Sequence, residues 1–495
     1  MLLSGLVKQT TFFLVIFFLW CYNNTDKKIS DKKISKVGDD MFYGRKNEVN
    51  LIRSVFEENN KAVLIYVKRR VGKTTLIKEA IKDFEFIYFE CLEDTVEKNI
   101  DSFIVTLNIK GITIPSYVSF KDFIDVFSYL DSLNKKYVIV IDEYPYLKTF
   151  NKAEYIDSMF QNVIDNHIKN LNLIVSGSSM KIMNEILKEG NALFGRFKET
   201  VLVEEFNYLE ASTYYYNDLN PYDKIAFYSV FGGSPYINEA INPKLNLKEN
   251  IMNTFLKNTN NVYNYADNLL LSDSSNRIQA KRIISSLGNS KKKYTEIENL
   301  LDKEKTGKIN VSLKSLIELK LVNKVFPINK PNDSKKAFYE IKDNAIRFFY
   351  TYVYSYKNNL EMLGSSAFYD EFIKESLNTY VSHRFEDICR TYFSLQVKKG
   401  VLKGIRNIGT YYYDDSLSKQ NGEFDVAIET SEGFNIYEVK YLKKPFDISS
   451  LKKEITQIQN IKGLKVNKIG FICINGFDFN SNEYELIDGD KIFKI

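Results

Sequence analysis

The chain has 495 residues, of which 44% are hydrophobic and 26% are charged, so it is too apolar for a disordered polypeptide and too long for a single core. Its four cysteines are widely separated, which argues against a disulfide framework or a zinc site, and its two histidines argue against imidazole-centred catalysis. The net charge of +5 is too small to identify an acidic partner unless the charge is locally concentrated.

The N-terminus begins with an apolar run, T-F-F-L-V-I-F-F-L-W-C-Y, at residues 11–22. The run is shorter than the roughly 20 residues that cross a bilayer, and no small-residue cleavage site follows it. We therefore expect residues 1–40 to be an appendage, with a cytoplasmic protein whose first domain begins near Met41. The alternative is a membrane-tethered protein that is anchored through residues 6–22.

The stretch A-V-L-I-Y-V-K-R-R-V-G-K-T-T-L-I-K-E at 62–79 predicts a buried strand, a phosphate-binding loop and an amphipathic helix. Lys73 would reach the β and γ phosphates of ATP, and Thr74 would ligate Mg²⁺. The loop departs from its pattern at Val67, where glycine is usual, so we expect Val67 to be the last extended residue of the strand. A lysine-rich turn between strand and helix is the alternative. The candidate nucleotide-binding residues of this loop are Arg70, Gly72, Lys73, Thr74 and Thr75.

A second strand, Y-V-I-V-I-D-E at 137–143, ends in two acids. Such an apolar run is typical of a parallel strand covered on both faces, and ligands bind at the carboxyl edge of such sheets. Asp142 would hold Mg²⁺ through water, and Glu143 would orient or deprotonate the attacking water. An ordinary helix cap is the alternative for these acids. A third strand ends in S-G-S-S at 176–179, so three strands predict one nucleotide-hydrolysing edge.

The motifs together resemble the archaeal-type P-loop ATPases, relatives of the AAA+ and STAND ATPases. The resemblance covers about residues 42–350 and rests on six motifs: F-Y-G-R-K-N-E (42–48), V-G-K-T-T (71–75), I-D-E-Y-P-Y-L (141–147), V-S-G-S-S (175–179), L-F-G-R-F (193–197) and F-G-G-S-P-Y (231–236). It implies a sensing role for Ser178 and a trans-acting or sensor arginine at Arg196, with a surface arginine as the alternative. It also implies a lid contact near the nucleotide through Gly233 and Pro235.

Two smaller units follow the ATPase core. The Tyr-rich stretch from Glu204 to Asn260 has a helical pattern and predicts a lid. Helices at 280–287, 294–301 and 312–321, then two strands around a polar turn, predict a winged helix. Residues 281–336 hold 14 Lys or Arg against 6 Asp or Glu, which fits either a DNA-facing module or a solvated packing module. The candidate phosphate contacts are Lys308, Lys314, Lys330, Lys335 and Lys336.

A helix at 344–354, a polar linker and a helix at 380–393 that carries Glu386 lead to a hairpin of strands 423–429 and 434–441. If the hairpin pairs Glu429 with Phe434, Asp425 lies opposite Glu438, and the period of two puts Lys440 on the same face. Two carboxylates beside a lysine can hold Mg²⁺ and activate water for phosphodiester hydrolysis.

This arrangement resembles the PD-(D/E)xK restriction-endonuclease-like nucleases, and also the domain of unknown function that often follows archaeal-type ATPases. The resemblance implies catalytic roles for Asp425, Glu438 and Lys440, with Asp425 and Glu438 as metal ligands. The alternatives are charged residues alternating on the open face of a hairpin, and an inactive nuclease-like domain that serves as a binding surface.

We therefore predict an α/β multidomain protein. The expected segments are an appendage (1–40), a P-loop ATPase core (41–203), a helical lid (204–277), a winged helix (278–355) and a nuclease-like α/β domain (356–495). ATP and Mg²⁺ are the expected cofactors, DNA is an expected partner, and whether two copies complete a site through Arg196 stays open. The main rival is a non-catalytic ATP-dependent switch or scaffold.

Overall fold

The computed structural model describes residues 44–58, 60–268, 277–288, 290–301, 306–415, 420–459, 461 and 463–494. All of these residues belong to the compact unit Gly44–Ile495. The apolar run at 11–22 lies outside them. Within the part of the chain that is described, no helix is both long and apolar enough to cross a membrane.

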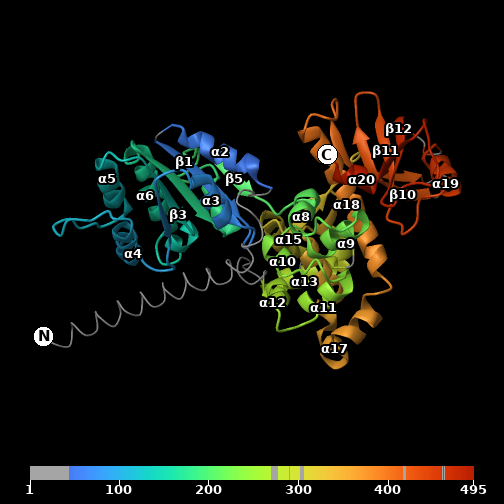
Figure 1. Ribbon diagram of the computed structural model, residues 1–495, viewed down its shortest axis with the longest axis horizontal. Helices are drawn as coiled ribbons and strands as arrows, with labels where there is room; N and C mark the ends of the chain where they lie inside the picture. Colours follow the sequence, from blue (N-terminus) through green and yellow to red (C-terminus); the bar gives the residue numbers. More distant parts are fainter. Residues whose placement is uncertain are drawn as a thin grey trace. The chain divides into compact units, whose positions relative to one another are not determined.

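The N-terminal part is a five-stranded, all-parallel sheet in the order β2-β3-β4-β1-β5. Figure 1 shows α2 and α3 on one side of this sheet and α4, α5 and α6 on the other. The strands are β1 (Lys61–Val67), β2 (Phe86–Glu90), β3 (Tyr137–Asp142), β4 (Leu171–Gly177) and β5 (Glu199–Val203). The helices are α2 (Lys46–Phe56), α3 (Lys73–Ile81), α4 (Val96–Ile109), α5 (Phe123–Ser132), α6 (Ala153–Asn166) and α7 (Met180–Ile186), with a 3-10 turn at Tyr144–Lys148.

Each strand of this sheet is apolar on both faces because helices cover both. In β1, alternate residues such as Ala62 and Leu64 join a core with α4, α5 and α6, while the residues between them are equally buried. Strands β3, β4 and β1 are neighbours, so the segments that follow them meet at one edge, as the three strand endings predict.

The next part is mainly helical. It contains α8 (Tyr208–Tyr215), α9 (Pro221–Phe231), α10 (Pro235–Asn238), α11 (Leu247–Thr254), α12 (Asn261–Asn268), α13 (Arg277–Leu287), α14 (Tyr294–Leu300), α15 (Thr306–Glu318) and α16 (Asn344–Tyr352). A small sheet in the order β6-β8-β7 combines β6 (Lys292–Lys293), β7 (Val322–Val325) and β8 (Phe338–Ile341). The helices predicted near 280, 294 and 312 and the two strands after them are thus present.

The polar linker predicted after residue 354 is wrong. A 3-10 turn at Tyr354–Tyr356 and helix α17 (Lys357–Phe372) occupy this segment. Gly364, with φ 72°, interrupts the helical backbone, so the apolar residues do not keep one period along the segment. This break explains why the segment has no clear helical pattern in the sequence.

The C-terminal part is a mixed sheet in the order β13-β12-β11-β10-β9, antiparallel from β9 to β11 and parallel from β11 to β13. Its elements are α18 (Leu377–Lys398), β9 (Asn407–Asp415), β10 (Gln420–Glu429), β11 (Phe434–Lys440), α19 (Ile448–Gln459), β12 (Val466–Cys473), β13 (Glu485–Asp488) and α20 (Gly489–Phe493). One hydrophobic core runs from α9 and α16 through α18 into β10 and β11, so the helical part and this sheet share buried side chains.

Candidate functional site

The phosphate loop connects the end of β1 to the start of α3. Gly72 is the N-cap of α3 and has φ 89°, a conformation that favours glycine. The helix therefore begins at Lys73, and the backbone N–H groups of its first turn, which includes Thr74 and Thr75, are free of intrahelical partners. A helix start of this kind, with its positive dipole end, is suited to bind phosphate oxygens.

Val67 is accommodated as the last residue of β1, as the sequence predicts. It is buried and pairs with Val203 of β5. Its φ is not positive, so the backbone at this position does not require glycine. The positive φ in the loop before Gly72 belongs instead to Arg70, at 67°.

Lys73, Asp142 and Glu143 converge at the carboxyl edge of the sheet. The Lys73 ammonium forms ion pairs with the Asp142 carboxylate and with Glu143 Oε1, the latter at 2.6 Å. Lys73 and Asp142 are both buried. The predicted loop lysine and the two predicted acids therefore lie together, in the arrangement that binding of a phosphate and a Mg²⁺ ion would require.

Two further hydroxyls hold the Asp142 carboxylate. Ser176 Oγ donates to Asp142 Oδ1 at 2.6 Å, and the Tyr88 hydroxyl donates to Asp142 Oδ2. Burial raises the pKa of the Asp142 carboxyl, but the Lys73 ammonium and these hydrogen bonds outweigh burial and leave that pKa lowered. Asp142 is therefore held as an anion, the form that binds a metal. Tyr88 was missed in the sequence, where it is one residue of an apolar strand.

Glu143 is held in an unusual backbone conformation, with φ 50°. The Ser178 backbone N–H donates to Glu143 Oε2 at 3.1 Å, and Ser178 Oγ donates to Glu143 Oε1 at 2.6 Å. Ser178 thus orients the carboxylate that we expect to position the attacking water. Strained residues of this kind concentrate at functional sites.

Pro235 and Arg70 lie where the loop meets α10. A Cβ at Gly72 would lie 3.7 Å from Pro235 Cγ, so the start of α10 is in contact distance of the loop. The Arg70 guanidinium lies over the ring of Tyr236, 4.1 Å from its centroid, and Ser234 Oγ donates to the Arg70 carbonyl. These contacts join the phosphate loop to the segment G-G-S-P-Y.

Arg196 lies away from this cluster in every contact that the described residues show. Its Nε is 3.1 Å from Asp165 Oδ1, and the pair is partly exposed. The structure therefore brings together Lys73, Asp142, Glu143 and Ser178, but not Arg196. A role for Arg196 toward a second copy of the chain stays a prediction.

Arg45, to which the sequence assigns no role, contacts the phosphate loop. It is buried, and its Nη2 donates to the Val71 carbonyl at 2.6 Å and to the Glu204 carbonyl at 3.1 Å. Its guanidinium also lies 4.8 Å from the centroid of the Phe206 ring. Arg45 thus ties the phosphate loop to the segment that leads from β5 into α8. The signal in the sequence is the position of Arg45 in F-Y-G-R-K-N-E.

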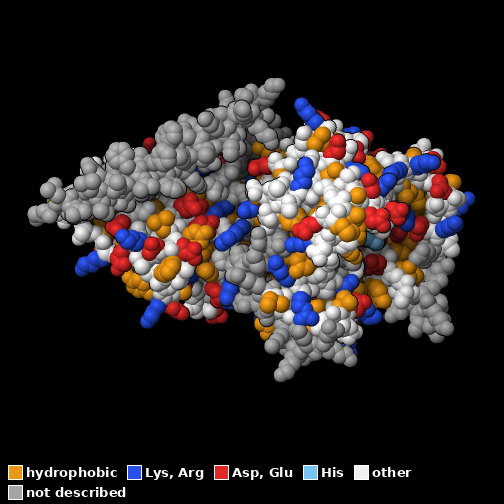
Figure 2. All heavy atoms as spheres, turned by 90° about the horizontal axis from the view of Figure 1, so that it is seen from below, with side chains coloured by type: hydrophobic (Ala, Val, Ile, Leu, Met, Phe, Trp, Pro, Cys, Tyr) orange, Lys and Arg blue, Asp and Glu red, His pale blue; other side chains and the backbone are white. Residues whose placement is uncertain are grey.

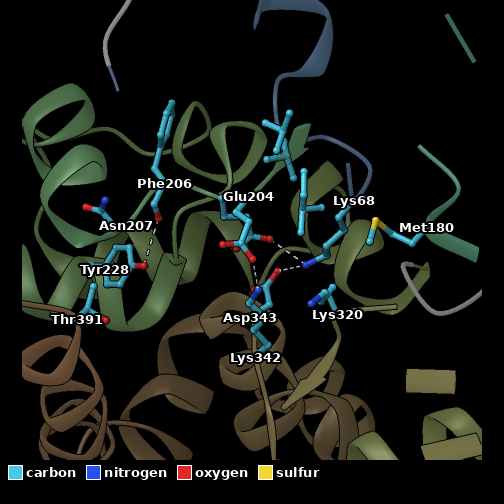
Figure 3. Close-up of a pocket in the computed structure, with 14 residues that line it drawn as sticks. Lys68, Met180, Glu204, Phe206, Asn207, Tyr228, Lys320, Lys342, Asp343 and Thr391 are labelled. Carbon is cyan, nitrogen blue, oxygen red and sulfur yellow. Dashed lines mark hydrogen bonds and ion pairs between the residues drawn. The ribbon is translucent and has the colours of Figure 1, made fainter. Parts of the chain in front are cut away.

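Lys68 is the first residue after β1, and its side chain belongs to the cluster of charged residues drawn in Figure 3. Its Nζ lies 2.9 Å from Glu205 Oε1 and 2.5 Å from Asp343 Oδ2. Asp343 Oδ1 accepts the Ile346 backbone N–H at 3.0 Å and so caps α16. The phosphate loop is therefore connected directly to the start of α16, which is 275 residues away in the sequence.

These charges line a cavity of about 270 Å³ between the loop, the end of β5 and the β8–α16 connection. Burial, and after it the Asp343 carboxylate, raises the pKa of Glu205 to about 7. Burial also acts to raise the pKa of Asp343, but the Lys68 ammonium outweighs it, and that pKa is lowered. One lysine thus faces two carboxyl groups. Asp343 is the one that stays ionised near pH 7.

The C-terminal hairpin has the predicted register. Glu429 pairs with Phe434 and Val426 with Tyr437. Asp425 Oδ2 accepts the Val439 backbone N–H at 3.0 Å.

Lys440 lies on the predicted face of this hairpin. Its Nζ is 2.8 Å from Glu438 Oε1, and also 2.9 Å from Glu454 Oε1 on α19. Glu454 was not predicted, because nothing in its spacing from the hairpin marks it.

The carboxylates of this second site influence one another. Burial, then Glu438 and Glu386, raises the pKa of Asp425 well above its usual range. Burial also raises the pKa of Glu438, although Lys440 opposes it. Glu386 is thus close enough to act on the hairpin, as its place on the preceding helix predicts. Carboxyls that burial and like charge make costly to ionise are suited to gain a divalent cation.

No group of three or more His, Cys, Asp or Glu side chains among the described residues is arranged to hold a metal ion. Two carboxylates with water ligands still meet what Mg²⁺ requires in proteins. Asp425 and Glu438 would be the residues that hold one such ion, and Asp142 and Thr74 would be those that hold another at the phosphate loop. At each place the ion would supply charge stabilisation and an activated water.

The lysines predicted to contact DNA lie at the surface. Lys314, Lys330 and Lys335 are exposed, Lys336 lies 5.0 Å from the ring centroid of Tyr412, and the side chain of Lys308 is outside the described residues. On the face drawn in Figure 2, basic and acidic side chains are interspersed. Charge alone thus does not mark a nucleic-acid surface on that face.

The parallel sheet, the phosphate loop at the start of α3 and the paired acids after β3 define a P-loop ATPase. Residues 42–241 match the family described as an ATPase domain predominantly from Archaea, and residues 349–458 match the family described as Archaea bacterial proteins of unknown function. Residues 42–241 thus form an archaeal-type P-loop ATPase domain, and residues 349–458 form the second domain toward the C-terminus.

Other proteins are similar over larger parts of the chain. An uncharacterized protein of Methanocaldococcus jannaschii is 27% identical over 357 residues, which cover 71% of this chain and 77% of that protein. The Walker-type ATPase of Pyrococcus abyssi matches with 16% identity and a TM-score of 0.45, over 62% of this chain and 96% of that one. The ORC2 protein of Aeropyrum pernix, solved with ADPNP and ADP, matches with 11% identity and a TM-score of 0.45, over 66% and 96%.

Proposed function

We propose that the chain couples ATP binding and hydrolysis to Mg²⁺-dependent cleavage of DNA by its C-terminal domain. The observation that supports the proposal is the contact of the Lys440 ammonium with Glu438 on β11, beside Asp425, whose Oδ2 accepts the Val439 backbone N–H. Lys440 would stabilise the charge that develops on a phosphodiester, and the two carboxylates would hold Mg²⁺ and its water.

ATP would be hydrolysed at the other end of the chain. Lys73 and the first turn of α3 would bind the phosphates, Thr74 and Asp142 would hold Mg²⁺, and Glu143 would position the attacking water. Ser178 would fix the orientation of Glu143, which it contacts twice.

The route between the two sites runs through Lys68 and Asp343. A phosphate that moves the loop acts on Lys68, and Lys68 is paired with the residue that caps α16. Helix α16 shares its core with α18, the helix that carries Glu386. The helices and small sheet of residues 277–341 support a winged-helix role for this part, with its exposed lysines on the DNA backbone.

Nicking of supercoiled plasmid by the full chain with Mg²⁺, with and without ATP, tests the proposal. Glu438→Gln should lower cleavage by at least about a hundredfold, because it removes a metal-binding charge. The matched control is Glu432→Gln, an exposed acid in the hairpin turn, which should cut like the parent. Cleavage that survives Glu438→Gln unchanged would contradict the assignment.

A second candidate is an ATP-dependent switch whose C-terminal domain binds nucleic acid without cutting it. It is favoured by one observation, the second ion pair of Lys440 with Glu454, which engages the lysine with two acids. ATP turnover compared with Lys73→Ala separates the two functions. A switch would bind ATP, turn it over little faster than the variant, and leave plasmid intact with any metal.

A further inference from the structure

A cavity of about 360 Å³ lies beside α16 and α18, apart from both sites described above. Its walls come from the α13–β6 connection, α16, the 3-10 turn after it, the end of α17 and the first turns of α18. A volume of this size is in the range of pockets that hold small ligands.

The walls of this cavity carry positive charge. Arg347, His383 and Arg384 line it, and none of the described residues that line it is acidic. The His383 and Arg384 side chains also contact acids one turn further along α18, Glu386 at 3.1 Å and Asp387 at 2.8 Å. Glu386 and Asp387 are not among the residues that line the cavity.

Arg347 supplies the second observation. It is only 5% exposed, its Nη2 donates to the Ile341 carbonyl, and the same nitrogen lies 3.4 Å from Glu340 Oε2, an acid outside the cavity lining. Its Nε has no hydrogen-bond partner among the described residues. A buried N–H without an acceptor is costly, so an acceptor that reached Arg347 Nε from the cavity would stabilise the site.

Aromatic rings and hydroxyls share the same walls. Tyr356 and Phe372 have ring centroids 5.0 Å apart, and both rings are partly accessible. Thr351, Ser376 and Thr379 add hydroxyl groups. Accessible aromatic rings beside arginines and hydroxyls are the groups that bind a base by stacking and a phosphate by charge.

The cavity also adjoins the carboxylate site. Tyr380 lines it, and Glu386 lies six positions further along α18, about 9 Å along the axis at 1.5 Å per residue. His383, which also lines the cavity, contacts Glu386 Oε1 through its Nδ1 and so lies between the cavity and this acid. A strand whose phosphate lies at Asp425 and Glu438 would thus place a neighbouring nucleotide at the cavity.

We propose that this cavity binds one nucleotide of the nucleic-acid strand, its phosphate at Arg347 and Arg384 and its base against Tyr356 and Phe372. The inference rests on the proposed function only for the source of the nucleotide. The same chemistry would accept a free mononucleotide, so the test must distinguish a strand from a free nucleotide.

The test measures binding of a fluorescein-labelled single-stranded oligonucleotide to the full chain in EDTA, where no cleavage occurs. Thr379 is exposed at the cavity wall on α18, so Thr379→Glu adds a negative charge without disturbing the core. Binding should weaken by about tenfold, the size of one like-charge interaction at partial solvent screening. Thr379→Gln, of the same size but neutral, should stay within about twofold of the parent.

Competition identifies the source of the ligand. A nucleoside monophosphate that displaces the oligonucleotide only at far higher concentration supports a site on a strand. A monophosphate that binds while the oligonucleotide does not would overturn the strand assignment. Equal oligonucleotide binding by parent, Thr379→Glu and Thr379→Gln would overturn the cavity as a site.

The two proposals fail separately. Glu438→Gln removes cleavage but leaves the cavity intact, so it should still bind the oligonucleotide and still lose that binding when combined with Thr379→Glu. If the parent cleaved plasmid and Thr379→Glu did not change oligonucleotide binding, the proposed function would stand and the cavity inference would be wrong. Thermal unfolding and ATP turnover of each variant, unchanged from the parent, would exclude misfolding.

Discussion

At the residue scale, the buried charges beside the phosphate loop make the stability of the protein depend on pH. Glu205 has a pKa of about 7 instead of its ordinary 4.5, because burial and Asp343 both disfavour its charge. Between these two pH values the folded protein holds a proton that the unfolded chain releases. The contribution of Glu205 to the free energy of unfolding therefore falls as pH rises from about 4.5 to about 7, and does not change further above that.

Glu205→Gln should remove this slope, since the amide resembles the protonated acid at every pH. The loss should approach about 1.4 kcal/mol per pH unit, the value for one proton. Thermal unfolding midpoints of parent and variant between pH 5 and pH 8 measure it, with Glu204→Gln, the exposed neighbour paired with Lys342, as control. If the midpoints of parent and Glu205→Gln changed with pH in parallel, Glu205 would not titrate between pH 5 and pH 8.

At the element scale, the order of strands in the sequence predicted the sheet edge, because parallel strands bring their carboxyl ends together. The hairpin register was also predictable, since T-S-E-G fixes the loop length and the loop fixes the pairing of Glu429 with Phe434. Neither inference needed contacts between distant parts of the chain. The roles of Lys73, Asp142 and Glu143 followed from local pattern in the same way.

What the sequence did not reveal depends on long-range contacts or on broken periodicity. Lys68 and Asp343 are 275 residues apart, and no local pattern marks either as a partner of the other. Glu454 reaches Lys440 only because α19 packs against the sheet. Helix α17 was missed because Gly364 interrupts it. Such features follow from tertiary packing, which single-sequence patterns do not encode.

Also at the element scale, the segment before α2 controls the phosphate loop through Arg45. Lysine at this position keeps the charge, but its ammonium is one bond closer to the backbone than Arg45 Nη2, the nitrogen that donates to both the Val71 and Glu204 carbonyls, and it lacks the planar group that lies over Phe206. Arg45→Lys should therefore weaken ATP binding by about tenfold, the equivalent of one lost charged hydrogen bond. Titration with a fluorescent ATP analogue measures the change.

The matched control is Arg53→Lys, within helix α2. Arg53 also donates to backbone carbonyls, those of Glu79 and Ala80, but at the far end of α3. It should lower stability slightly and leave ATP affinity within about twofold of the parent. Equal losses of affinity in the two variants would mean that α2 acts on the loop through overall stability and not through Arg45.

At the scale of the whole molecule, Asp343 is one residue through which the phosphate loop contacts the helices that lead to the C-terminal part. Its two oxygens serve two partners, the Lys68 ammonium and the N-terminus of α16. Asn in its place keeps the cap, because Asn is as good an N-cap as Asp. The substitution removes the negative charge that pairs with Lys68, and Lys68 keeps Glu205 as its other partner. Asp343→Asn thus separates coupling from folding.

In Asp343→Asn, ATP turnover should stay within about twofold of the parent, because Lys73, Asp142 and Glu143 are untouched. The effect of ATP on plasmid nicking, or on oligonucleotide binding if nicking is absent, should shrink toward none. Asp370→Asn on α17, which breaks the exposed pair of Asp370 with Lys248 of α11, should keep the full ATP effect. If Asp343→Asn also kept it, the Lys68–Asp343 pair would only hold the fold together, and nucleotide state would have to reach the C-terminal domain through Pro235 and α10.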